Sequence, residues 1–319
     1  MTSGKLSPQA LAKSVFAYGG KEDSRLIVGP GAGEDSAVIR WEAPYMVVCS
    51  DPITGASEGA GALLVDVNVN DLACKGAEPR YLVVTLILPP HFGEEGVKAL
   101  MNEISQRASQ LGVTIAGGHT EFNAAYPQPV LSATAFGEAS KPMALSDAQA
   151  GDQLILTKHL GLEGMSILAT DRPDLLDFLS EEELDELKSW RRHLSVLPES
   201  RILRHFAHAM HDPTEGGFDG GVTELALGAG LAAHIEAEKL PLHPLTVKVA
   251  RHLGFDPRKL IASGTLLAAL SPEDVPTALA QLAEAGIAAT AVGCLKEGQS
   301  ELSSHEELWG LLERERRTS

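Results

Sequence analysis

One short stretch of the chain, residues 66–79, concentrates side chains that could do chemistry. Between two apolar runs it holds Asp66, Asn68, Asn70, Asp71 and Lys75. A buried carboxylate is costly unless a positive charge pairs with it, and a metal ion is the simplest partner for neighbouring acids and amides. The alternative is that Asn70 and Asp71 cap a short helix beginning near Leu72, because both residue types cap helices well.

Three further carboxylates stand beside glycine turns or at the ends of apolar runs. Asp35 follows the glycines of residues 29–33, Asp51 follows the apolar run 46–49, and Asp212 precedes a proline. Carboxylate oxygens are the ligands that Mg²⁺ takes in proteins, and the ion commonly bridges them to phosphate oxygens. We therefore interpret these acids, together with Asp71, as one divalent-cation cage for a nucleotide.

The composition narrows the class of protein. A chain of 319 residues predicts two domains of ordinary size, and 44% hydrophobic with 22% charged residues is typical of a globular protein. A net charge of −17 argues against a nucleic acid partner, because such binding depends on Lys and Arg neutralising phosphates. A triphosphate can still bind where Mg²⁺ bridges it to carboxylates.

The sequence also predicts a compartment. No segment approaches the about 20 apolar residues of a membrane span. Residues 1–10 lack the basic start and apolar run of a secretory signal. Cys49, Cys74 and Cys294 have no CxxC spacing, which fits small core residues in a reducing compartment. We therefore expect a cytoplasmic protein with no membrane partner.

Three glycine-rich polar turns are expected to present the chemical groups. The first, residues 29–33, lies between the strand-like runs 26–28 and 36–39. It lacks the Gly-Lys-Ser/Thr of a Walker loop and the helix that must follow a dinucleotide fingerprint, so an NAD-type oxidoreductase is rejected and a plain hairpin is the alternative. The second turn, 117–121, follows a strand, and the third, 212–218, follows a helix expected over 199–211.

Hydrophobic periodicity predicts the elements that position these turns. Helices are expected over 94–111, 180–193, 222–231 and 272–286, and strands over 45–50, 81–88, 113–116, 130–136 and 153–157. The small and polar residues around 139–152 predict a boundary between a domain of residues 1–145 and a domain of residues 150–319.

Five blocks of sequence, in this order, resemble the aminoimidazole ribonucleotide (AIR) synthetase superfamily over nearly the whole chain. They are residues 33–38 (GEDSAV), 50–51 (SD), 69–79 (VNDLACKGAEP), 117–120 (GGHT) and 212–217 (DPTEGG). The superfamily includes AIR synthetase, selenophosphate synthetase, thiamine-monophosphate kinase and the hydrogenase expression/formation protein E. The resemblance implies ATP bound with Mg²⁺ by acidic loops and, in most members, phosphorylation of an oxygen or selenium atom.

The resemblance also implies roles for single residues and a fold. The implied metal ligands are Asp35, Asp51, Asp71 and Asp212. The implied nucleotide contacts are Gly33, Asn70, Lys75, Gly117, Gly118, His119 and Thr120. The implied fold is α/β in two domains: an N-terminal domain that binds ATP and Mg²⁺, whose strands near Val47 and Val83 join a second subunit in a barrel, and a C-terminal α/β domain. A homodimer is therefore expected.

The layout looks most like the hydrogenase-maturation protein, which uses ATP to dehydrate a thiocarboxamide on its own C-terminal cysteine. This chain ends in Thr318-Ser319 and has no cysteine after Cys294, so we expect no such adduct. Where that branch usually has Asp, Lys and Arg, this sequence has His119, Glu121 and Glu215.

Two functions are carried forward. The first is an Mg-dependent ATP-binding enzyme that phosphorylates or dehydrates a small or protein-bound oxygen substrate, with the second substrate left open. The alternative is a non-catalytic nucleotide-binding partner protein in a maturation or biosynthetic complex. ATP hydrolysis that depends on Asp71 would distinguish the two.

Overall fold

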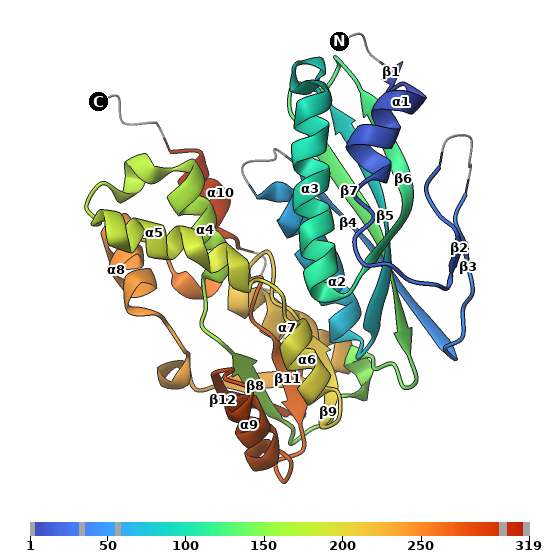
Figure 1. Ribbon diagram of the computed structural model, residues 1–319. Helices are drawn as coiled ribbons and strands as arrows, with labels where there is room; N and C mark the ends of the chain where they lie inside the picture. Colours follow the sequence, from blue (N-terminus) through green and yellow to red (C-terminus); the bar gives the residue numbers. More distant parts are fainter. Residues whose placement is uncertain (1–3, 32–35, 55–58, 300–304, 315–319) are drawn as a thin grey trace. The chain divides into compact units, whose positions relative to one another are not determined.

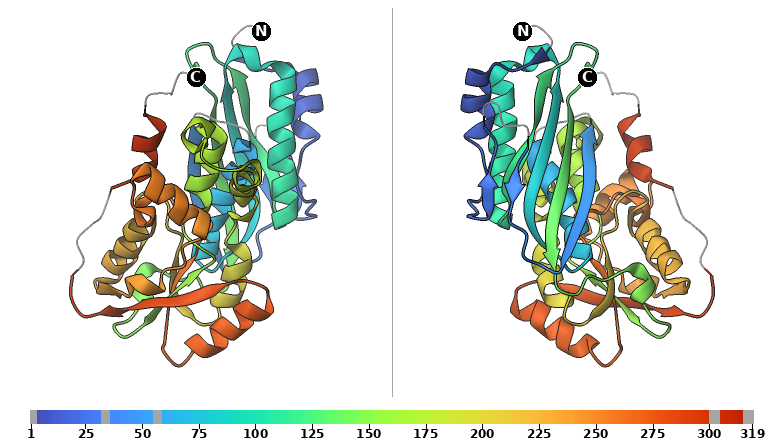
Figure 2. Two further views of the ribbon diagram at one scale, coloured as in Figure 1. Left: turned by 90° about the vertical axis from the view of Figure 1, so that its left-hand side faces the viewer. Right: turned by 90° about the vertical axis from the view of Figure 1, so that its right-hand side faces the viewer.

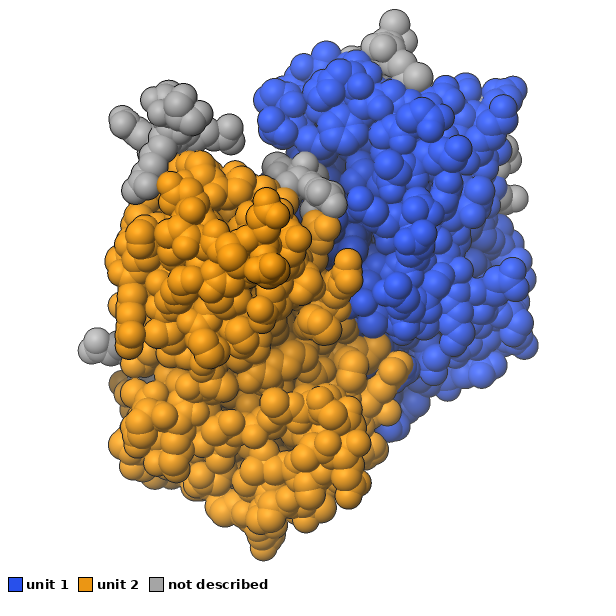
Figure 3. Space-filling view, turned by 60° about the vertical axis from the view of Figure 1, so that its left-hand side comes forward, with its two compact units in different colours: residues 1–72, 77–142 blue, residues 73–76, 143–319 orange. Residues whose placement is uncertain are grey.

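The computed structural model describes residues 4–31, 36–54, 59–299 and 305–314, so Gly33 and Asp35 lie outside the described residues. The chain forms two compact units, residues 1–72 with 77–142 and residues 73–76 with 143–319, which are coloured separately in Figure 3. Across the described ranges, none of the helices has both the length and the apolar character needed to span a membrane.

The first unit is built on a five-stranded sheet in the order β1-β6-β5-β7-β4 (Figure 1). Its strands are Gly4–Lys5 (β1), Tyr45–Thr54 (β4), Glu78–Leu88 (β5), Thr114–Phe122 (β6) and Val130–Ala139 (β7). Strands β5 and β6 run parallel, whereas β1, β4 and β7 pair antiparallel with their neighbours. A parallel pair needs a crossover connection, and the amphipathic helix Gly93–Leu111 (α3) supplies it.

Helices cover one face of this sheet. They are Pro8–Leu11 (α1), which continues into a π-helical turn at Ala12–Phe16, Ala60–Cys74 (α2) and α3. The right-hand view of Figure 2 looks onto the other face, which no helix of the described part of this unit covers. Side chains along β5 and β7 alternate between buried positions and partly exposed ones, as a sheet covered on one side requires.

A two-stranded hairpin, Leu26–Val28 (β2) with Val38–Ile39 (β3), flanks the sheet. The prediction that the first glycine turn lies between two short strands is thus confirmed. Ion pairs hold the base of the hairpin: Arg25 Nη1 lies 2.5 Å from Glu138 Oε1 on β7, and Arg80 Nε of β5 lies 2.7 Å from Glu138 Oε2. Hydrogen bonds from Arg25 and Tyr81 keep the pKa of Asp23 well below its usual range, although burial opposes this.

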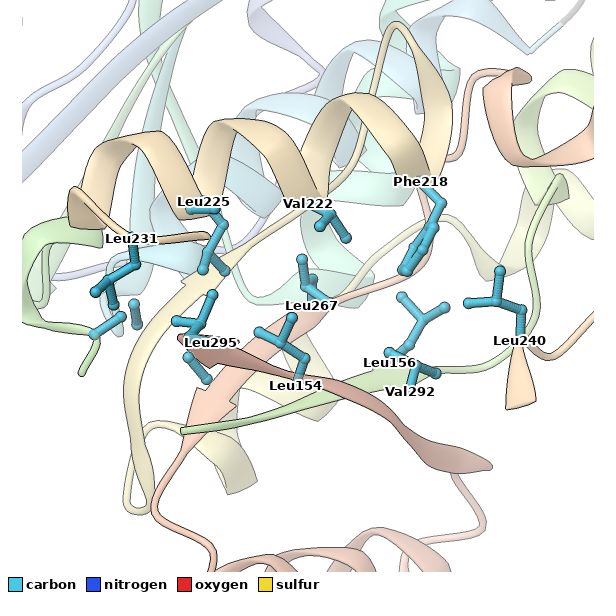
Figure 4. Packing of buried hydrophobic residues seen from close by; sticks show 14 of the residues in the cluster. Leu154, Leu156, Phe218, Val222, Leu225, Leu231, Leu240, Leu267, Val292 and Leu295 are labelled. Atoms are coloured by element: carbon cyan, nitrogen blue, oxygen red, sulfur yellow. The ribbon is translucent and has the colours of Figure 1, made fainter. Parts of the chain in front are cut away.

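The second unit contains a five-stranded antiparallel sheet in the order β10-β12-β8-β11-β9. Its strands are Gln153–Thr157 (β8), Ala207–His211 (β9), Ala232–Ile235 (β10), Leu267–Leu270 (β11) and Ala289–Lys296 (β12). Helix Gly217–Ala229 (α7) lays Phe218, Val222 and Leu225 on one face of this sheet (Figure 4). They meet strand residues that include Leu154, Leu156, Leu267, Val292 and Leu295.

The described residues of the second unit form six more α-helices. They are Leu162–Asp171 (α4), Glu181–Ser189 (α5), Leu197–Leu203 (α6), Pro244–Leu253 (α8), Val275–Glu284 (α9) and Glu307–Leu312 (α10). The predicted capping box at the start of α5 is confirmed, since Ser180 accepts from the Glu183 N–H and Glu183 accepts from the Ser180 N–H.

Three predicted elements differ from the structure. The helix expected to begin near Leu72 begins at Ala60, so Asn70 and Asp71 lie in its last turns and not at an N-cap. Because α2 is buried on most sides, its sequence has no clear apolar stripe to mark it as a helix. The second glycine turn is part of the continuous strand β6. The helix expected over 199–211 ends at Leu203, and 207–211 forms β9 through pairing with β11.

Candidate functional site

The clearest site feature of the first unit is the attachment of Asp51 to helix α2. Asn68 Oδ1 accepts a hydrogen bond from the Asp51 N–H at 3.0 Å. Asn68 Nδ2 donates to the carbonyls of Asp51 at 3.3 Å and of Leu64 at 2.9 Å. The Asn68 side chain is fully buried. Because it bonds both the N–H and the carbonyl of Asp51, it pairs with the edge strand β4 as a neighbouring strand would. The backbone of Asp51 is therefore fixed to α2, and within the described ranges no side chain pairs with its partly exposed carboxylate.

Helix α2 also carries the other predicted acids and amides. Asp71 lies three residues after Asn68, and residues three apart lie on the same side of a helix, so Asp71 is on the side of α2 that meets Asp51. Asn70 is completely buried. Asp66 is accounted for structurally, because its carboxylate pairs with Arg107 of α3 at 2.8 Å.

Strand register separates the predicted residues of β6 onto two faces. Gly118 aligns with Val84, Ala133 and Asp51 across four strands, and Thr120 aligns with Leu86 and Leu131, which are buried beneath the helices. Successive side chains of a strand point to opposite faces. His119 is therefore on the face that no described helix covers, where its Nε2 lies 3.2 Å from Glu121 Oε2. Thr120 shares the face of Asp51, and His119 does not.

Gly118 has a backbone reason to be glycine. Its φ is +154°, and a Cβ built there would lie 1.8 Å from the carbonyl oxygen of Val84 on the neighbouring strand. No real Cβ tolerates such a contact. Gly117 meets nothing within 4 Å and carries no such constraint.

The third glycine turn forms the candidate site of the second unit, to which residues 73–76 at the end of α2 belong. The buried carboxylate of Asp212 accepts a hydrogen bond from the Cys74 thiol at 3.2 Å, and Ser200 donates to the Ala73 carbonyl at 2.7 Å. Lys75 adds its carbonyl oxygen, which accepts from the Met143 N–H at 3.2 Å. Asp212 is thus presented on an anchored loop.

A buried acid lies near this loop. Glu163, in the first turn of α4, is 4% exposed and hydrogen bonds to Ser263. Burial raises its pKa to about 7, and the charges of Glu306 and Asp212 add to this, although the Ser263 hydrogen bond opposes it. The surroundings of Asp212 therefore hold a carboxyl group that titrates near neutral pH.

Two structural roles were not foreseen from the sequence. Lys158, in a left-handed conformation with φ +54°, donates to the carbonyls of His193, Ser195 and Gly264 and pairs with Glu199 at 2.7 Å. The second is the role of Asn68, because the sequence resemblance assigns the site role to Asn70. Lys158 contacts residues far along the chain, and Asn68 reaches Asp51 on another element, so no local motif indicates either role.

The donor set suits a hard cation. In the ranges that the structure describes, no three His, Cys, Asp or Glu side chains gather closely enough to hold a metal ion on their own. Asp35 lies outside those ranges. The carboxylates of Asp51 and Asp71 are oxygen donors, as Mg²⁺ prefers, and phosphate and water oxygens usually complete its shell. The residues present fit a cation that a nucleotide helps to hold.

Comparison with known proteins places this fold. A crystal structure of hydrogenase maturation protein HypE in complex with ATP superposes with a TM-score of 0.76 at 22% identity, covering 92% of this chain and 87% of that one. The fold is that of the two-domain, mixed α/β proteins of the AIR synthase type, as the sequence predicted.

The sequence comparisons define the family. Residues 33–139 match the family "AIR synthase related protein, N-terminal domain", and residues 149–304 match "AIR synthase related protein, C-terminal domain". The chain belongs to this family, which includes ATP-using enzymes. Carbamoyl dehydratase HypE of Rhodobacter capsulatus is 30% identical over 84% of this chain and 78% of its own length. Selenide, water dikinase of Pseudomonas putida is 29% identical over 93% of each chain.

Proposed function

We propose that this protein is an Mg²⁺-dependent ATP-binding enzyme that uses the γ-phosphoryl group of ATP to phosphorylate or dehydrate an oxygen substrate. The observation that carries the proposal is Asp51, whose backbone is fixed to α2 through Asn68 and whose carboxylate has no side-chain partner among the described residues. A second acid, Asp71, lies on the same side of α2, and a divalent cation held by both carboxylates would offset the repulsion between them. Family membership independently supports ATP as the nucleotide.

In this proposal the ligands of Mg²⁺ are Asp35, Asp51, Asp71 and Asp212, and the bound ion neutralises the charge of the triphosphate. Asn68 keeps Asp51 in place. Asp212, held by the Cys74 thiol, would be the ligand from the second unit. Gly33, Asn70, Lys75, Gly117, Gly118 and Thr120 would contact the nucleotide. His119 is assigned to the opposite face of the sheet, so we propose it for the subunit interface and not for direct contact with phosphate.

We also propose a homodimer formed through the uncovered face of the first sheet. Met46 and Val48, which alternate with Asp51 along the edge strand β4 and so lie on the uncovered face, are each about half exposed. Large apolar side chains on an edge strand are usually covered by a partner. A second copy of the chain would cover them and would extend the sheet into the barrel that the sequence resemblance implies.

Titration calorimetry tests the nucleotide proposal. ATP should bind in the presence of Mg²⁺, and its affinity should fall steeply when a chelator removes the ion, because acidic loops on a chain of net charge −17 repel a bare triphosphate. Equal affinity in chelator would contradict the cation cage. Mg-ATP binding without ADP formation, across a panel of hydroxyl, carboxamide and selenide acceptors, would favour the non-catalytic partner protein.

A further inference from the structure

A segment near the end of the described chain holds the loop that presents Asp212. The carboxylate of Glu306, the residue just before α10, accepts hydrogen bonds from three backbone N–H groups. Gly216 donates to Oε2 at 2.7 Å, and Ile261 and Leu308 donate to Oε1 at 3.0 and 2.8 Å. One side chain therefore joins α10, the loop 212–217 and the segment 258–262.

The loop and this neighbouring segment lie in close backbone contact. Gly217 has φ +61°, and a Cβ there would lie 2.5 Å from the Arg258 carbonyl oxygen and 2.6 Å from that of Leu260. The Ala262 N–H donates to the Thr214 carbonyl at 3.3 Å. These contacts leave no room for a side chain at position 217. The Glu306 carboxylate therefore bridges two segments that are already in backbone contact.

The segment that carries Glu306 is anchored along its length. Leu308 and Leu311 are buried. At the far end, the buried Arg172 donates to the carbonyls of Leu311 and Leu312 at 3.0 and 2.7 Å, where a cation is favoured by the helix dipole. Asp174 holds the same guanidinium in place through two hydrogen bonds. Helix α10, which follows Glu306, is therefore held in place by burial and by Arg172.

We propose that Glu306 is a positioning residue for the nucleotide site, and that residues 306–312, which we name the strap, act through it to fix the loop 212–217 in the shape that presents Asp212. The proposal rests on the proposed function only for its effect on Mg-ATP. Its effect on the loop itself stands on the hydrogen bonds alone. All three partners of the carboxylate are donors, so an acceptor-only group is required at this position.

This requirement defines the test variant. Glu306→Gln keeps the size of the side chain but turns one acceptor into an NH₂ donor facing a backbone N–H, which leaves a buried donor without a partner. The matched control is Glu307→Gln on the same strap. Its Oε1 accepts a long hydrogen bond from the Asp256 N–H at 3.3 Å and lies 3.5 Å from His305 Nε2, and neither contact is with the loop 212–217, so the same loss of charge there should spare the loop.

Two measurements distinguish the role of Glu306 in the loop 212–217 from the proposed binding of Mg-ATP. Amide hydrogen exchange of a peptide covering 212–217, measured without nucleotide, should become at least about tenfold faster in Glu306→Gln and stay unchanged in Glu307→Gln. The Kd for Mg-ATP should rise about tenfold in Glu306→Gln alone, with the melting temperature within a few degrees of the parent.

The outcomes are distinct. Exchange at the parent rate in Glu306→Gln would overturn the proposal, as would faster exchange with an unchanged Kd for Mg-ATP. If the parent itself does not bind Mg-ATP, the proposed function fails while the exchange result still decides the role of Glu306 in the loop. Should Glu306→Gln not fold, Arg172→Gln loosens the far end of the strap and should speed exchange of 212–217, and an unchanged rate there would overturn the proposal.

Discussion

At the scale of single residues, the best-supported positioning contact is the amide of Asn68. Its two hydrogen bonds with the backbone of Asp51 hold β4 against α2, and the amide is needed because one end must accept while the other donates. An amide that pairs with both the N–H and the carbonyl of one residue replaces the strand that an edge lacks.

Asn68→Asp should therefore destabilise the protein by about 3 kcal/mol, because a carboxylate oxygen would face the carbonyls of Leu64 and Asp51 in a buried place. The control is Asn102→Asp on the exposed side of α3, which should change the free energy of unfolding by less than about 0.5 kcal/mol. Urea unfolding of both variants measures the difference. Equal stabilities would show that Asn68 does not hold β4.

Glu163 gives stability a dependence on pH. Its pKa of about 7 in the folded protein lies above its usual value, so the folded state binds the proton more tightly than the unfolded state does. Stability should then fall as pH rises from about 5 to 8, by about 2 to 3 kcal/mol.

Glu163→Gln, which mimics the protonated acid, should remove this dependence in metal-free buffer, whereas Glu284→Gln on the exposed side of α9 should retain it. The measurement is urea unfolding at pH 5, 6, 7 and 8. Parallel curves for the parent and Glu163→Gln would mean that Glu163 does not titrate in this range.

Residue types predicted the candidate acids better than they predicted their surroundings. Asp51 and Asp71 stand out because carboxylates next to apolar runs need a partner. Asn68 could not be selected in the same way, since its role depends on β4 and α2 meeting across sixteen intervening residues. Glu163 likewise lies in an apolar-looking helix start, where nothing local indicates complete burial.

At the scale of elements, the amphipathic helix α3 and the strands expected over 45–50, 81–88, 130–136 and 153–157 were predicted, whereas α2 and β9 were not. Helix α3 has one apolar face and was placed within one residue of its observed bounds. Helix α2 has none, and β9 has a sequence, Ala-His-Ala-Met-His, that is a strand only because β11 pairs with it. The Gly-Gly pair of β6 indicated a turn. In the structure, Gly118 is needed because the neighbouring strand β5 lies too close for a Cβ there.

That close approach is testable. Gly118→Ala should destabilise the protein by at least about 3 kcal/mol, because its methyl group would overlap the Val84 carbonyl oxygen in the middle of the sheet. Gly117→Ala, one position earlier in the same strand, has open space and should cost less than about 1 kcal/mol. Thermal unfolding compares the two. Similar melting temperatures would contradict the packing described for β5 and β6.

At the scale of the whole molecule, sequence blocks spread along the chain predicted the family, and the two matched regions confirm it. Single motifs would not have sufficed, because each glycine turn has a purely structural interpretation. The identity of the second substrate is a property of side chains around the site and is not fixed by fold or family.

The dimer is a prediction at this scale. Light scattering at micromolar concentration should give about twice the 33.7 kDa of one chain. Val48→Glu on the exposed edge of β4 should shift the protein to monomer, since a charge would be buried against the partner, while Leu227→Glu on the exposed side of α7 should not. A monomeric parent would contradict the proposed interface.

The most direct test of the central claim compares three charge-neutralising variants by calorimetry with Mg-ATP. Asp51→Asn and Asp71→Asn keep the size of the side chain but remove the charge that a hard cation needs, so each should weaken binding at least about tenfold while the fold is retained. Asp185→Asn, at a carboxylate that is 77% exposed on α5, makes the same change in net charge and should bind as the parent does. Parent-like affinity in Asp51→Asn and Asp71→Asn would contradict the account, because these acids would then not hold the cation.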